Sequence, residues 1–231
     1  MFNQQNIFNN QSIPATAEAS TFMNKVFGWM SAGLLVTAVT AHWTANNIGF
    51  IPSSWYFMLF LGQIFLVYKI SRNVMNMPVN QATGLFILYS ALTGVSLSGL
   101  TMIYTAASIS STFFSTAILF GAMAIYGITT KSDLTSMGRF LYMGLIGIFI
   151  SSLINIFIGS SILQLAISAI GVIIFTGLTA YDTQKILQMY QSGDIYSDSG
   201  TKKAVLGALI LYLDFINLFI FLLQFLGVRN K

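Results

Sequence analysis

The sequence contains very few charged residues. Only 7% of its 231 residues are Asp, Glu, Lys or Arg, while 55% are hydrophobic, and the mean hydropathy is +0.77. A soluble domain carries about a quarter charged residues, so this chain could not cover a soluble surface. Apolar stretches long enough to cross a bilayer recur along its length. The composition therefore excludes a soluble catalytic domain and predicts a polytopic membrane protein whose main partner is the lipid bilayer.

Several chemistries are excluded by what the chain lacks. It has no cysteine, and its only histidine, His42, cannot build a metal site alone; we expect it to pack near the interface. There is no H-E-x-x-H, G-x-S-x-G or phosphate-loop motif, so we expect neither enzyme activity nor a bound cofactor. The net charge of +4 comes from basic residues at the ends of apolar runs, which is typical of membrane orientation rather than of nucleic-acid binding.

Seven apolar segments predict an all-α bundle of seven transmembrane helices. Their approximate bounds are 26–45, 54–71, 82–104, 107–128, 139–158, 162–186 and 205–227. Helices are expected because the segments lack the alternating polarity of barrel strands. Residues 22–231 would form this domain, while residues 1–21, polar and rich in Asn and Gln, are predicted to be a disordered tail. The loop at 188–203 is predicted to be mobile.

The basic residues predict the orientation of the bundle. Eight of them fall near the tail or in the even-numbered loops: Lys25, Lys69, Arg72, Lys131, Arg139, Lys185, Lys202 and Lys203. The positive-inside rule then places the N-terminus in the cytoplasm. Seven spans would put Arg229 and Lys231 outside, so the last segment either crosses fully or re-enters. Its length favours a full crossing, and both alternatives stay open.

Two of the six acidic residues lie inside apolar segments. Asp182 is about five residues, and Asp214 about nine residues, from the predicted cytoplasmic ends of the last two helices. At about 1.5 Å per residue their depths differ by roughly 6 Å, so the two carboxylates could meet. A charge at membrane depth costs at least about 2–3 kcal/mol and usually faces the interior of the bundle. Two adjacent carboxylates would share a proton that is lost as the pH rises, which makes the pair a candidate pH sensor.

Neighbouring residues offer partners and one alternative. Arg72, or less well Lys69, could supply a cation to the pair, and Tyr181, Tyr212 and Asn217 could donate hydrogen bonds. Alternatively, Asp182 could simply pair with Lys185 three residues on, near the interface. A calcium ion could bind transiently at Asp182 and Asp214, because hard cations take oxygen ligands.

Four stretches carry a resemblance to a known family. They are FTGLTAYDTQKI (175–186), ALILYLDFINLFIFLLQFLG (208–227), ALTGVSLSGLTMIYT (91–105) and FGAMAIYGITTKSDLTSMG (120–138). They resemble bacterial members of the transmembrane Bax inhibitor motif family, also called the Bax inhibitor-1 family. The resemblance covers nearly the whole chain from about residue 22.

The resemblance implies a fold and a mechanism. It implies seven helices with the last one central, and a pH-sensitive latch in which Asp182 and Asp214 match the family's paired aspartates. Arg72 is the best match here to the family's arginine on the second helix. The implied function is a pH-dependent calcium leak in a bacterial inner membrane. The alternative implied function is modulation of a membrane-bound FtsH-type protease through the N-terminal tail. The sequence does not indicate an oligomeric state.

Overall fold

The protein is described by a computed structural model that covers residues 17–47, 52–190 and 196–230. Its helices are α1 (Ala17–Asn47), α2 (Ser53–Asn73), the 3-10 turn η2 (Val74–Asn76), α3 (Val79–Leu97), α4 (Leu100–Ile103), α5 (Ala106–Thr129), α6 (Thr135–Ile158), α7 (Ser161–Met189) and α8 (Asp198–Leu226). These residues form no strand; an isolated bridge pairs Tyr104 with Arg229. The all-α class predicted from the sequence is confirmed.

Six helical segments are long and apolar enough to cross a membrane. They are Ala17–Asn47, Val79–Ile103, Ala106–Thr129, Thr135–Ile158, Ser161–Met189 and Asp198–Leu226. The segment predicted at 54–71 also forms a helix, α2, but α2 is not among the six. The chain is therefore a multi-helix membrane protein, and the count of seven spans stays a prediction.

Several predicted boundaries differ from the structure; for example, helices α7 and α8 cover residues 188–189 and 198–203 of the predicted mobile loop. Helix α1 begins at Ala17, so residues 17–21 of the predicted disordered tail are helical, while residues 1–16 lie outside the described part of the chain. The predicted helix 82–104 is divided into α3 and α4. There the amides of Thr101 and Met102 bond the carbonyls of Ser98 and Gly99, three residues back, at 3.2 Å each. This spacing is that of a 3-10 turn, so the helix is wound more tightly at this point.

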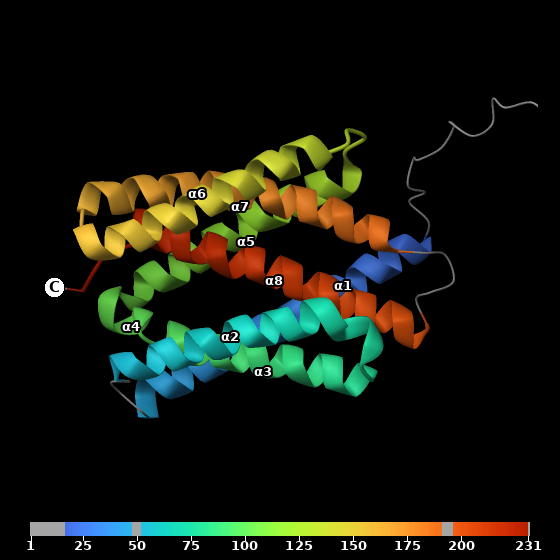
Figure 1. The fold of residues 1–231 in the computed structure, drawn as a ribbon, viewed down its shortest axis with the longest axis horizontal. Helices are drawn as coiled ribbons and strands as arrows, with labels where there is room; N and C mark the ends of the chain where they lie inside the picture. The colour runs from blue at the N-terminus through green and yellow to red at the C-terminus, as the bar shows by residue number, and fades with distance from the viewer. Residues whose placement is uncertain (1–16, 48–51, 191–195, 231) are drawn as a thin grey trace, which may run out of the picture.

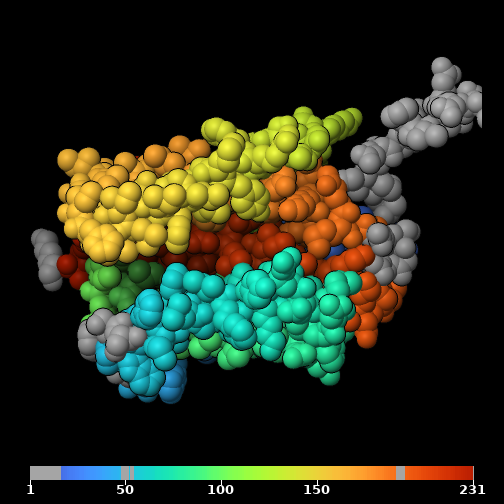
Figure 2. Space-filling view, in the orientation of Figure 1, coloured from blue at the N-terminus to red at the C-terminus, as the bar shows by residue number. Residues whose placement is uncertain are grey.

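The helices pack side by side as a bundle, in which α8 has neighbours on more than one side (Figure 1). Helix α8 packs against α1, α3, α5 and α7. In its most apolar window 67% of the residues are buried, whereas the other five candidate spans have at most 39%. Figure 2 shows part of α8 between α6 and α2 on one face of the molecule. The apolar side chains on the outer helices, such as Phe157 and Ile118, face outward, as expected for a surface in contact with lipid.

The last helix runs along the bundle without a break. Helix α8 is continuous for 29 residues, and residues 227–230 lie at the end of the bundle opposite to the start of α1 (Figure 1). There they clamp the α4–α5 turn: Thr105 N donates to Val228 O at 3.1 Å, and Asn230 N donates to Ile103 O at 2.9 Å. A full crossing of the membrane by the last segment stays a prediction, which the unbroken length of α8 and its place among the six candidate spans favour.

Candidate functional site

The two apolar-segment aspartates both lie in the interior, where α7 and α8 pack together. Asp182 on α7 is 3% exposed and Asp214 on α8 is 5% exposed. The carboxylates are close enough to interact electrostatically with one another. A buried carboxylate needs a hydrogen bond, a counter-charge or a proton, because desolvation disfavours its charged form.

A tyrosine from a third helix supplies one of these partners. Tyr142 on α6 donates its hydroxyl to Asp182, at 3.1 Å from Oδ1 and 3.2 Å from Oδ2. Sequence reasoning missed Tyr142, because nothing in its local sequence separates it from the other tyrosines. One signal existed. Tyr142 is seven residues after Thr135, where α6 begins, and Asp182 is seven residues before Met189, where α7 ends. Adjacent antiparallel helices therefore place both at one depth.

Asp214 is less well satisfied. Its Oδ2 atom is buried and has no hydrogen-bond partner in the described part of the protein, and the same holds for Oγ1 of Thr183, next to Asp182. Buried polar atoms without partners are rare in folded proteins. The site of the two aspartates thus has polar oxygen atoms without partners, which a proton, a water molecule or a cation could bind.

The other side chains predicted to support the pair bond elsewhere. Tyr212 hydrogen-bonds Thr37 Oγ1 at 2.6 Å, linking α8 to α1. Asn217 donates to the carbonyl of Leu213 in its own helix at 2.8 Å. Tyr181 packs edge-on against Tyr142, with ring centroids 6.0 Å apart. None of these three contacts involves a carboxylate.

The predicted cations are also arranged differently. Lys185 is exposed, with Nζ 5.6 Å from the centroid of the Tyr181 ring; it interacts electrostatically with Asp182 but forms no ion pair with it among the described residues. Arg72 is exposed at the end of α2, and within the described ranges neither it nor Lys69 forms an ion pair with an aspartate. The latch role of Arg72, or of Lys69, stays a prediction.

A glutamine holds the α5–α6 connection against α7. Buried Gln184 accepts a hydrogen bond from Leu134 N at 3.0 Å and donates to Ser132 O at 2.9 Å. It thereby satisfies one of the free N–H groups at the start of α6. In the same connection, the hydroxyl and then the backbone N–H of Thr135 donate to Asp133 and lower the pKa of its exposed carboxyl. Gln184 thus links α7 to the start of α6, the two helices that also meet through Tyr142 and Asp182.

A second polar cluster, which the sequence did not indicate, lies at the far end of α6, α7 and α8. Asn155 Nδ2 donates to Gln164 Oε1 at 3.2 Å, and Gln164 Nε2 donates to Gln224 Oε1 at 2.9 Å. Ser168 Oγ lies 3.2 Å from the same Gln224 oxygen. We call these four residues the amide cluster. It carries no charge.

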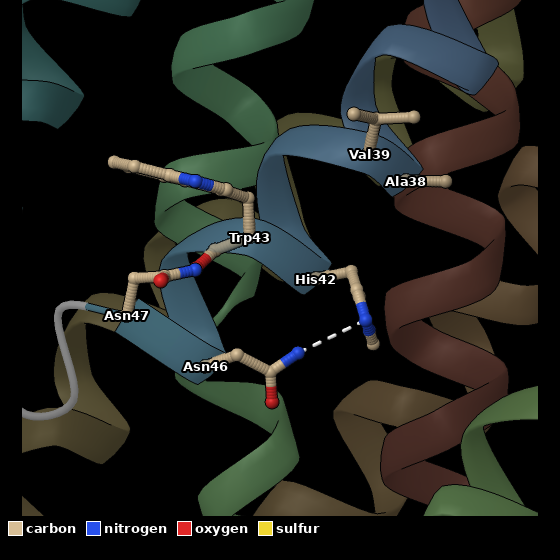
Figure 3. A pocket seen from close by; sticks show the side chains of 6 residues that line it. All are labelled: Ala38, Val39, His42, Trp43, Asn46 and Asn47. Atoms are coloured by element: carbon tan, nitrogen blue, oxygen red, sulfur yellow. Dashed lines mark hydrogen bonds between the residues drawn. The ribbon is translucent and has the colours of Figure 1, made fainter.

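A shallow hollow on α1 lies apart from the carboxylates. It encloses about 500 Å³ and is lined by Ala38, Val39, His42, Trp43, Asn46 and Asn47. Figure 3 shows His42 and Asn46 turned toward one another, with His42 Nε2 and Asn46 Nδ2 at 2.9 Å. Within the described ranges no three His, Cys, Asp or Glu residues are grouped as a metal site would require. Any calcium at Asp182 and Asp214 would therefore need further oxygen ligands from water or backbone carbonyls.

Comparison with known proteins places the chain in a family. The family model described as "Inhibitor of apoptosis-promoting Bax1" matches residues 19–231. The inner membrane protein YbhL of Escherichia coli K12 is 47% identical over 220 residues, which cover 93% of this chain and 94% of YbhL. An uncharacterised protein of Borreliella burgdorferi is 51% identical over 215 residues, covering 91% of this chain and 93% of that protein. The chain therefore belongs to the Bax inhibitor-1 family of membrane proteins.

Proposed function

We propose that the protein is a pH-sensitive leak pathway for cations, chiefly calcium, gated by Asp182 and Asp214. The observation that carries this proposal is the buried Asp214 carboxylate, whose Oδ2 atom lacks a hydrogen-bond partner in the described structure beside a second buried carboxylate. A purely structural acid would be expected to be satisfied. An ionisable residue at membrane depth is most readily explained by an ion or proton route.

The arrangement supports a protonation-dependent change of state. When the pair shares a proton, α7 and α8 can stay together; when both carboxylates ionise, they repel one another in a poorly solvated site. The ionisable side chains that interact with the pair are Tyr142 and Lys185. The buried position of α8, in contact with four other helices, supports treating it as the central helix of the bundle. A change at Asp214 would then reach most of the bundle.

The proposed location is a bacterial inner membrane, with the start of α1 on the cytoplasmic side. A relative that is named an inner membrane protein supports the location, and the clustering of basic residues supports the orientation. The alternative, modulation of an FtsH-type protease through residues 1–21, stays a prediction. No described contact favours it, because most of these residues lie outside the described ranges.

The test is calcium flux into liposomes that contain the purified protein, measured from about pH 5 to 8, a window in which a shared carboxylate proton can be lost. Wild-type flux should change with pH, and Asp214→Asn, which cannot ionise, should flatten that dependence. Asp198→Asn is the matched control, because Asp198 is an exposed acid in the first turn of the same helix. Folded Asp214→Asn protein with the wild-type pH profile would contradict the proposal.

A further inference from the structure

One face of α7 meets one face of α8 along most of the bundle. Residues three, four or seven apart share a helix face. This spacing joins Asp182, Phe175, Gly171, Ser168 and Gln164 on α7, and Asp214, Asn217, Phe221 and Gln224 on α8. We call this contact the α7–α8 seam. The two carboxylates interact electrostatically toward one end of the seam, and the Gln164–Gln224 hydrogen bond joins the helices at the other.

The seam is polar at both ends and aromatic in the middle. Phe175 and Phe221 stack across it, with ring centroids 5.7 Å apart and an interplanar angle of 27°. Phe175 is seven residues from Asp182 and seven from Ser168, or about 10 Å along the helix in each direction. The stacked rings thus separate the carboxylate pair from the amide cluster.

The Phe221 ring fills the space available to it. A Cβ atom added at Gly171 would lie 2.6 Å from the ring, closer than such atoms ever approach. Only glycine therefore leaves room for the ring at that level of α7. Phe175 is 5% exposed and Phe221 is partly buried against the core, so both rings are packed. In channels, hydrophobic constrictions exclude water and ions by dewetting.

We propose that Phe175 and Phe221 form the permeability barrier of the α7–α8 seam, with the amide cluster as the end of the same route beyond them. This inference rests on the proposed leak function and names the residues that close it. The carboxylates would set the pH response, and the two rings would keep the closed bundle impermeable to hydrated cations. The amide cluster, which is uncharged, would give a cation oxygen atoms in exchange for part of its hydration shell.

The first experiment measures access and does not depend on ion flux. Because the chain has no cysteine, Asn217→Cys places a single thiol on the seam between Phe221 and Asp214. A charged, membrane-impermeant maleimide is added to liposomes from the side on which an Asn47→Cys protein reacts. Adding Phe221→Ala should raise the labelling rate at least about tenfold, because the constriction opens to water.

Two further variants control for side-chain loss and misfolding. Phe225→Ala removes the same side chain from an exposed position of α8 and should label like the protein with Phe221 intact. Phe221→Leu keeps an apolar side chain and should remain closed. If Phe221→Ala does not fold, Phe175→Ala takes its place with the same expectation. Unchanged labelling in the folded alanine variant, or an equal rise with Phe225→Ala, would overturn the barrier.

Calcium flux in the same liposomes separates this inference from the proposed function. Phe221→Ala should leak more than wild type at every pH tested. If labelling rises but neither protein passes calcium, the barrier stands and the leak proposal fails. If wild type leaks in a pH-dependent way, and Phe221→Ala alters neither labelling nor flux, the leak proposal stands and the barrier is wrong.

Discussion

Tyr142 connects the carboxylate pair to a third helix. Its hydroxyl bonds both oxygens of Asp182, and Asp182 interacts with Asp214. A side chain from α6 therefore acts on a contact between α7 and α8. The energy of this hydrogen bond decides how strongly α6 is held to the pair.

Replacing Tyr142 with phenylalanine should destabilise the protein by about 1 kcal/mol. Hydrogen bonds between membrane helices average about 0.6 kcal/mol, but a buried group left without its partner costs about 1–3 kcal/mol, and Asp182 is only 3% exposed. The measurement is unfolding of the purified protein in detergent. Tyr126→Phe, on the exposed face of α5, is the matched control. Equal stability of the two variants would mean that the Tyr142 bond contributes nothing.

Individual residues could be predicted from sequence only where their chemistry is rare. Asp182 and Asp214 stand out because charges are scarce in apolar segments, and the structure buries both. Tyr142, Gln184 and Gln224 do not stand out, because uncharged polar residues occur on every face of membrane helices. Their roles depend on helix register, which no single segment specifies.

Two glycines of α5 differ in whether helix packing requires the absence of a side chain. A Cβ at Gly127 would collide with the carbonyl oxygen of Ala180 on α7, whereas a Cβ at Gly121 would have nothing within 4 Å. The first glycine permits close approach of two backbones, and the second does not. Comparing the two glycines therefore distinguishes the effect of close helix packing from the general effect of having glycine in a helix.

Gly127→Ala should destabilise the protein by about 1–3 kcal/mol, because α5 and α7 must separate to admit the methyl group. Gly121→Ala, six residues earlier in the same helix, should leave stability unchanged or raise it slightly, since alanine is the better helix former. Thermal unfolding of both variants in detergent gives the comparison. A destabilisation shared by both would show that chain flexibility matters more than the contact with Ala180.

The lengths of the apolar segments were enough to predict that these helices exist, but not where the helices begin and end. The segments predicted at 107–128, 139–158 and 162–186 became Ala106–Thr129, Thr135–Ile158 and Ser161–Met189. The extra residues include polar ones such as Thr129, Thr135 and Gln188, and the start of α6 is held by the Gln184 bond to Leu134 N. Such contacts come from other helices, so they cannot be predicted from hydropathy along the chain.

At the scale of the whole molecule, basic residues mark one end of the bundle. Eight lie toward the start of α1, while Arg229 is the single one at the opposite end among the described residues. The start of α1 is also bound to the end of α7: Tyr190 hydrogen-bonds Glu18, and its ring lies 5.7 Å from that of Phe22. By the positive-inside rule, the charge distribution predicts that this end faces the cytoplasm.

Single cysteines should report that orientation in intact cells. Asn47, Gln188 and Arg229 are exposed, and the structure places the first and last at the end opposite to the start of α1 (Figure 1). Asn47→Cys and Arg229→Cys should react with a membrane-impermeant maleimide, because the positive-inside rule puts that end outside. Gln188→Cys should react only after permeabilisation. Labelling of Gln188→Cys alone would mean an inverted bundle, whereas protection of Arg229→Cys beside a labelled Asn47→Cys would mean that the last segment re-enters.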